Sequence, residues 1–237
     1  MNHARIEILP DVEALSLRAA DLFEQLASTA LAQRNLFTVC LSGGSTPKLL
    51  YSKLAQRNLS WDQIHLFWGD ERCVPPDSAD SNFRMVKEAL LDSISIPEQN
   101  VHRMHGEMAD HEQAAIRYET ELRDFFDTSN FPRFDLVHLG LGEDGHTASL
   151  FPGSPALREQ RRWVLETQGA ASPYLSRLTL TLPVLNAAAH ICFLVAGAPK
   201  AGPFKRVFEE RDRSLPAALI EPQDGDLLFL ADHAAAG

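Results

Sequence analysis

The chain has 237 residues, of which 45% are hydrophobic and 23% are charged, which is typical of a folded globular protein. Its formal net charge of −10 disfavours a broad surface for nucleic acid or anionic membrane, whereas a small anionic ligand needs only a few local cations. We therefore expect one domain over residues 1–237, with no nucleic-acid, membrane or obligate protein partner.

Strand-like and helix-like patterns alternate along the chain. Asp11 can cap a first helix, in which Leu15, Leu22 and Leu26 recur at helical spacing. Continuous apolar runs predict buried strands at 36–41, 64–68, 134–139, 163–167, 176–181, 189–196 and 227–231. Further helices are expected from near Pro47, from Asp80 or Ser81 to Leu91, over 109–127, and from Pro199 to Glu210.

Apolar strands that alternate with helices are typical of a parallel sheet covered on both faces. The predicted fold class is therefore α/β with a mainly parallel sheet. Polar residues cluster directly after three of the strands, at 42–48, 69–77 and 140–149. Because ligands bind at the carboxyl ends of the strands in such sheets, these loops predict a single crevice.

The first of these loops, residues 42–47, lies between a strand and a helix. Gly43 and Gly44 let the backbone approach a ligand closely, and Ser45 and Thr46 can donate from their hydroxyl groups. The N-terminus of the following helix adds free N–H groups and a positive dipole end, which together suit a phosphate. A tight turn with Ser or Thr as the helix cap is the alternative, and the Walker pattern of the P-loop is absent.

Three cations are candidates to complete the phosphate site. Lys200 follows a predicted strand at the start of a helix, where a cation is unfavourable for the helix dipole, and this position suggests contact with a ligand. Arg72 and Arg177 offer planar donor groups that suit phosphate. A solvated surface position is the alternative for each of the three.

The stretch 139–153 contains the pattern Gly-x-Gly-x-x-Gly at Gly140, Gly142 and Gly145. A dinucleotide site is disfavoured, because Glu143 and Asp144 would lie beside the pyrophosphate and prolines interrupt the helix that such a site requires. Glu166 nevertheless lies near the expected position of the ribose-binding acid, so this interpretation stays open as an alternative.

The same loop is better interpreted as the support of a catalytic histidine. An imidazole can move a proton between water and a leaving group, which makes His146 a candidate for acid–base catalysis. Asp144 or Glu143 could orient the ring, and Gly142 and Gly145 would permit an unusual backbone conformation. We predict that His146 is a general base; a structural, hydrogen-bonded histidine is the alternative.

Other chemistry is less well supported by the sequence. No nucleophile elbow of the form Gly-x-Ser-x-Gly is present. His102, His105 and His111 match no strong zinc template and are expected to face solvent, so no metal is predicted. His138 alternates into an apolar strand and is expected near the core with its polar atoms satisfied.

The three cysteines, Cys40, Cys73 and Cys192, share no close spacing, and two of them lie in apolar strands as buried thiols. The N-terminus leads to no apolar signal segment, and the longest apolar run, 191–198, is too short to span a bilayer. These features predict a cytoplasmic protein of a reducing compartment.

Ordered blocks of this sequence resemble the 6-phosphogluconolactonase family, which is grouped with glucosamine-6-phosphate deaminase. The blocks are Leu41 to Pro47, Trp68 to Pro75, Asp80 to Met85, Gly140 to Gly153, Arg177 to Pro183, and Gly197 to Ala201. The resemblance implies a three-layer α/β sandwich with a Rossmann-like sheet, related to that deaminase and to ribose-5-phosphate isomerase. It also implies hydrolysis of 6-phosphoglucono-δ-lactone, in the oxidative pentose phosphate pathway, without a metal or organic cofactor.

The resemblance also assigns roles to residues. It implies that His146 activates water with support from Asp144, and that Gly43, Gly44, Ser45, Arg72 and Lys200 hold the substrate, chiefly its phosphate. Arg177, Asp70 and Asn82 are further expected substrate-binding residues. Glu143 departs from the family pattern, in which a small or polar residue is usual at this position.

Two other functions compete with this one. An aldose-phosphate deaminase or isomerase would use a base at Asp70, but the deaminases carry a tyrosine after the Asp-Glu pair where this chain has Arg72. A non-catalytic sugar-phosphate sensor would be expected to lose His146 or to carry a nucleic-acid-binding segment. The sequence shows neither feature.

Overall fold

The computed structural model describes residues 4–168 and 175–237 of the chain. Its main sheet has seven strands, in the order β1-β10-β9-β6-β2-β3-β5, and every neighbouring pair is parallel. The strands of this sheet are β1 (Arg5–Leu9), β2 (Phe37–Leu41), β3 (Ile64–Trp68), β5 (Val101–His102), β6 (Leu136–Gly140), β9 (His190–Val195) and β10 (Asp226–Asp232).

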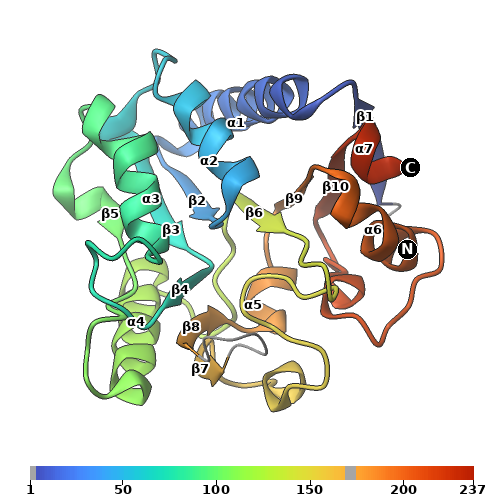
Figure 1. Ribbon diagram of the computed structural model, residues 1–237. Helices are drawn as coiled ribbons and strands as arrows, with labels where there is room; N and C mark the ends of the chain where they lie inside the picture. The colour runs from blue at the N-terminus through green and yellow to red at the C-terminus, as the bar shows by residue number, and fades with distance from the viewer. Residues whose placement is uncertain (1–3, 169–174) are drawn as a thin grey trace.

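Helices pack against both faces of this sheet (Figure 1). They are α1 (Val12–Arg34), α2 (Ser45–Leu54), α3 (Asn82–Ala89), α4 (His111–Phe126), α5 (Leu182–Asn186), α6 (Ala201–Phe208) and the C-terminal α7 (His233–Ala236). Asp11, Ser81 and Asp110 cap α1, α3 and α4 by accepting backbone N–H groups of the first turn, as short polar side chains do.

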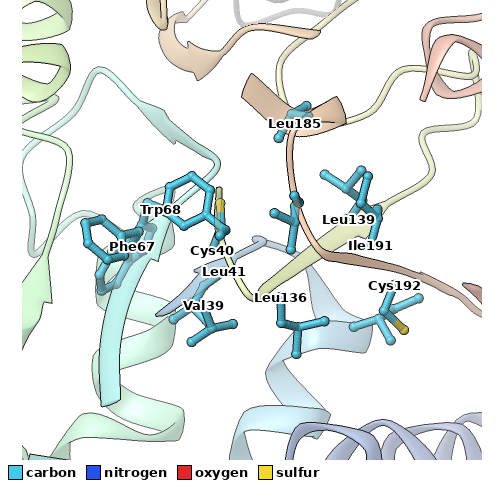
Figure 2. Packing of buried hydrophobic residues seen from close by; sticks show 14 of the residues in the cluster. Val39, Cys40, Leu41, Phe67, Trp68, Leu136, Leu139, Leu185, Ile191 and Cys192 are labelled. Atoms are coloured by element: carbon cyan, nitrogen blue, oxygen red, sulfur yellow. The ribbon is translucent and has the colours of Figure 1, made fainter. Parts of the chain in front are cut away.

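Aromatic contacts assign helices to the two faces. Phe23 of α1 packs edge-on against Phe37 of β2, and Tyr51 of α2 lies on the same face. Phe125 of α4 packs against Phe67 of β3 on the opposite face. Phe204 of α6 covers the same face over β10, where it contacts Phe229. Figure 2 shows the alternation, with Val39 and Leu136 on one side of the strands and Leu139 and Ile191 on the other. The predicted three-layer α/β sandwich is confirmed.

A second, three-stranded sheet was not expected from the sequence. It contains β4 (Asp70–Arg72), β8 (Ser176–Leu180) and β7 (Val164–Gln168), in this order, and both pairings are antiparallel. The strands predicted at 163–167 and 176–181 therefore exist, but they do not belong to the parallel sheet. Their apolar side chains are buried against other elements, so the pattern alone did not distinguish the two sheets.

The edge strands β1 and β5 also escaped prediction. Strand β1 is half exposed and lacks a continuous apolar pattern, and β5 has only two residues. Helix α2 begins at Ser45, two residues before Pro47, which lies in its first turn. None of the helices in the described ranges combines the length and the apolar character that crossing a membrane requires. The prediction that the N-terminus carries no signal segment concerns residues 1–3 in part, and these lie outside the described ranges.

Candidate active site

The strands of the main sheet direct four loops to one edge, where they enclose a cavity of about 580 Å³. The loops follow β2, β3, β6 and β9 at their carboxyl ends, which is where ligands bind in open α/β sheets. All ten residues predicted for the site line this cavity. They are His146, Asp144, Gly43, Gly44, Ser45, Arg72, Lys200, Arg177, Asp70 and Asn82.

His146 and Asp144 form a hydrogen-bonded pair in the loop after β6. Nδ1 of His146 lies 2.5 Å from Oδ1 of Asp144, and the backbone N–H of His146 donates to the same oxygen at 3.1 Å. Burial raises the pKa of the Asp144 carboxyl group, but the hydrogen bonds and the charge of His146 outweigh it and hold this pKa below its usual range. An ionised Asp144 keeps the proton of a neutral imidazole on Nδ1, which leaves Nε2 as an acceptor.

Small residues make room for the His146 ring. A Cβ atom at Gly142 would lie 2.1 Å from Nδ1 of His146, so no larger residue fits there without displacing the ring. Gly145 has φ +82° and meets the prediction of an unusual backbone, whereas Gly142 is needed for space and not for its φ angle. Hydrogen bonds from Gly142 N–H to the His146 carbonyl and from the Thr147 hydroxyl to Gly140 hold the loop.

Phe151 is part of the site, although the sequence assigned it no role. Its ring lies 4.8 Å from the His146 ring, centroid to centroid, and the guanidinium carbon of Arg177 lies 5.6 Å from its centroid. The side chain is almost fully buried. Phe151 thus contacts both the imidazole of His146 and the guanidinium group of Arg177.

The loop after β2 has the features of an anion site. Gly44 is the N-cap of α2 with φ +107°, and no side chain caps this helix. Among the described residues, no acceptor binds the backbone N–H groups of Ser45 and Thr46 at the start of the helix. Tyr51 holds the loop from below, because its hydroxyl group accepts from the Ser42 N–H and donates to the Ser42 carbonyl. The helix N-terminus therefore presents free donors to the cavity.

Arg72 and Arg177 lie opposite each other in the antiparallel pair β4–β8. The pKa of the Arg177 guanidinium is lowered, first by burial and then by the like charge of Arg72. Arg72 donates to the Asp80 carbonyl at 2.5 Å, but in the described parts of the chain neither arginine forms an ion pair with a carboxylate. Directly opposed like charges are destabilising, so their placement favours an anion between them.

Lys200 provides a third cation in the lining of the cavity. It ends the short 3₁₀ turn η5 (Ala198–Lys200) and directly precedes α6. Like the two arginines, it has no carboxylate partner within residues 4–168 and 175–237. The cavity lining thus holds these three cations together with the carboxylates of Asp70, Glu143 and Asp144, so it lacks the excess of negative charge that the whole chain carries.

Asp70 lies at the floor of the cavity with both carboxylate oxygens occupied. Oδ2 accepts from the Ser149 hydroxyl group at 2.6 Å, and Oδ1 accepts from the Asn82 amide at 3.3 Å. The Asn82 side chain also packs on Gly43, where a Cβ atom would lie 2.0 Å from its Oδ1. Asp70 and Asn82 thus connect the loops that carry Gly43 and His146.

Two expectations about histidines were wrong. His138 is buried as expected, but neither of its ring nitrogens has a hydrogen-bond partner among the described residues, because it packs between Phe23 and Tyr51. His102 does not face solvent: it is buried and bonds to His65 and Glu121. In the described ranges, no group of three or more His, Cys, Asp or Glu side chains is placed to hold a metal ion.

Fold and site together define an α/β protein in which a hydrogen-bonded histidine–aspartate pair shares one cavity with a cationic rim formed by Arg72, Arg177 and Lys200. A family model for glucosamine-6-phosphate isomerases and 6-phosphogluconolactonases matches residues 10–229. The chain is 44% identical to the 6-phosphogluconolactonase of a Nostoc species, over 97% of this chain and 96% of the relative. It is 45% identical to that of a Synechocystis species, over 98% and 96%. The chain belongs to this family.

Solved structures agree with this membership. The 6-phosphogluconolactonase of Thermotoga maritima superimposes with a TM-score of 0.85 at 32% identity, covering 97% of this chain and all of that one. A monomeric glucosamine-6-phosphate deaminase superimposes with a TM-score of 0.84 at 21% identity, over 98% of both chains, which shows the shared fold alone. The expected relation of the fold to the deaminase is thus confirmed.

Proposed function

We propose that this protein hydrolyses 6-phosphoglucono-δ-lactone to 6-phosphogluconate, a step of the oxidative pentose phosphate pathway. The relatives with the matching sequences are named for this lactonase activity. It is a lactone hydrolase, a kind of carboxylic ester hydrolase, as its identity of 44–45% to lactonases over nearly the whole chain supports. The substrate is a small sugar-phosphate lactone, and its hydrolysis by water would be catalysed by side chains of this chain.

The phosphate of the substrate would bind at the cationic rim. Arg72, Arg177 and Lys200 supply the charges, and the Gly43–Ser45 turn supplies backbone donors. An anion in this position removes the repulsion between the two arginines and occupies N–H groups that have no other acceptor among the described residues. The sugar then extends toward the loop after β6, so that C1 of the lactone reaches His146.

The hydrolysis would proceed through one tetrahedral intermediate. Nε2 of His146 takes a proton from water, and the resulting hydroxide attacks C1 of the lactone. Asp144 stabilises the imidazolium through the bond at Nδ1. When the intermediate collapses, the bond between C1 and the ring oxygen breaks, and His146 returns its proton to that oxygen. Fixing water and lactone in one cavity makes the attack effectively intramolecular.

The observation that carries the proposal is the pairing of a histidine oriented by Asp144 with three cations that lack carboxylate partners in the described ranges. The decisive assay follows acid release from freshly generated 6-phosphoglucono-δ-lactone in a pH-stat, above the spontaneous rate. Release that does not depend on enzyme concentration would exclude the lactonase function.

The deaminase or isomerase alternative is less well supported by the site. Arg72 follows Asp70 and Glu71 at the position where the deaminases carry a tyrosine, and the relatives matched at 44–45% identity are named lactonases. Incubation with glucosamine 6-phosphate is therefore expected to release no ammonia. A sensor would bind 6-phosphogluconate without accelerating hydrolysis of the lactone, so the pH-stat assay separates this alternative as well.

A further inference from the structure

The loop that carries Lys200 is held by a carboxylate from a different strand. Asp232, the last residue of β10, accepts the backbone N–H of Gly197 with both of its oxygens, each at 3.0 Å. Its Oδ1 also caps α7 by accepting the Ala235 N–H at 2.8 Å. The Asp232 side chain is only 6% exposed, so its hydrogen bonds face little competition from water.

Gly197 is the residue at which the chain turns from β9 toward Lys200. It has φ +94°, and its carbonyl group accepts the Lys200 N–H at 3.0 Å to close the turn η5. Strands β9 and β10 pair in register up to Val195 and Ala231, which brings Gly197 and Asp232 together. A single carboxylate therefore fixes the connection between the sheet and the lysine.

The charge of Asp232 acts on backbone groups and not on Lys200. The ammonium group has no ion pair in the described part of the chain, and the carboxylate instead accepts two backbone N–H groups, those of Gly197 and Ala235. A direct salt bridge would compete with an anionic ligand for the lysine. Holding the backbone leaves the cation free while restricting where it can point.

We infer that Asp232 is a positioning residue for the reaction: it orients Lys200 toward the phosphate of the substrate from outside the cavity. The inference rests on the proposed function, because it takes Lys200 to be a phosphate ligand. It makes the C-terminal turn, residues 232–236, part of the binding apparatus, although none of these residues lines the cavity.

A double-mutant cycle with Lys200 tests this inference, with 6-phosphogluconate as the probe in calorimetric titrations. Asp232→Ala is expected to weaken binding about tenfold, and Asp232→Asn, which keeps one acceptor oxygen, by less. In a Lys200→Ala background, the same substitutions should change the Kd by less than about twofold. In the lactonase assay, KM should rise with the Kd while kcat stays near the wild-type value, because His146 is on a separate loop.

The control is Asp110→Ala, which removes the comparable N-cap of α4 away from the cavity and should leave the Kd unchanged. If Asp232→Ala does not fold, as judged by thermal unfolding, Asp232→Asn decides the question. Equal losses with and without the Lys200 side chain, or no loss while that side chain is present, overturn the inference. A normal Kd for Lys200→Ala alone would instead show that Lys200 is not a phosphate ligand, which is a failure of the proposed function.

Discussion

Among single residues, His146 carries the proton transfers of the proposed reaction. We expect His146→Ala to lower kcat by about 10²- to 10⁴-fold, the usual contribution of a general base, while 6-phosphogluconate still binds. Stopped-flow or pH-stat rates and a titration with the product measure the two quantities. His105→Ala, which removes a histidine that bonds to Glu107 outside the cavity, is the matched control. Full lactonase activity in the His146 variant would rule out this role.

The position of the His146 ring depends on the absence of a side chain at Gly142. In Gly142→Ala, the new methyl group would overlap the imidazole, so the ring must rotate away from Asp144. We expect kcat to fall at least about tenfold, in line with the sensitivity of catalysis to small displacements, with little change in product affinity.

Gly202→Ala is the control for this substitution. Gly202 lies in α6, a methyl group added to it would meet no atom of the described residues within 4 Å, and alanine is the better helix former. This control should keep its activity and its thermal stability. Equal activity of Gly142→Ala and the wild type would mean that the ring adapts without loss of function.

The sequence predicted a role for His146 but could not explain the role of Gly142. The histidine was recognisable because carboxylates and glycines surround it after an apolar strand. Gly142 was expected to supply backbone freedom, whereas its need for space became visible only when the ring of a residue four positions later was placed over it. Phe151 was missed for the same reason: an apolar residue gains a role only through what it touches.

At the scale of elements, Glu71 ties strand β4 to helix α3. Its buried carboxylate accepts the N–H groups of Arg72, Asn82 and Phe83 at 2.7 Å each, and the Ser81 hydroxyl group at 3.1 Å. Burial raises the pKa of the Glu71 carboxyl group despite these donors. Because side chains alternate along a strand, Glu71 points away from the cavity that Asp70 and Arg72 line.

Glu71→Gln should therefore impair both stability and substrate binding. The amide NH₂ group would face backbone donors, and we expect a loss of about 1–3 kcal/mol in the free energy of unfolding. Displacement of Arg72 and Asn82 should raise KM several-fold. Urea unfolding and steady-state kinetics measure the two effects, with the exposed Glu209→Gln as the control. A variant with wild-type stability and KM would contradict the anchoring role of Glu71.

The elements themselves were predicted unequally. The buried strands of the parallel sheet are continuous apolar runs, and this pattern was sufficient to predict them from the sequence. Strands β7 and β8 show a similar pattern but pair with β4, because their partners are set by the path of the chain and not by local periodicity. Arg72 and Arg177 were each recognised as candidate cations, but their direct opposition follows from this pairing and could not be predicted.

For the whole molecule, the sequence predicted which loops meet, because parallel strands place their carboxyl ends at one edge. It did not predict what holds the loops in place. Glu71 and Asp232 lie outside the cavity, and both accept backbone N–H groups. Because every residue except proline has such a group, the sequence does not indicate which ones are bound. The residues that line the cavity could therefore be predicted from the loops, whereas the residues that support these loops became visible only in the packed structure.

The stability of the whole molecule should depend on pH through His138. Burial lowers the pKa of His138 to about 3, whereas in the unfolded chain the imidazole titrates near its ordinary pKa of 6.5. As the pH falls below 6.5, the unfolded state therefore binds a proton that the folded state does not accept. The contribution of His138 to the free energy of unfolding is therefore complete above pH 6.5. It decreases by roughly 1.4 kcal/mol per pH unit between pH 6.5 and pH 3.

Replacing His138 by leucine should remove this dependence. The substitution also removes two buried ring nitrogens that have no hydrogen-bond partner among the described residues. Because such groups are costly to bury, we expect the variant to be more stable at pH 7.5 by about 1–3 kcal/mol. The advantage should grow by a further 2–3 kcal/mol, roughly, at pH 4.5. Urea unfolding at both pH values measures it. Some dependence will remain, because burial also lowers the pKa of His65 to about 4. If the difference between His138→Leu and the wild type is the same at both pH values, His138 is not the group whose protonation destabilises the fold.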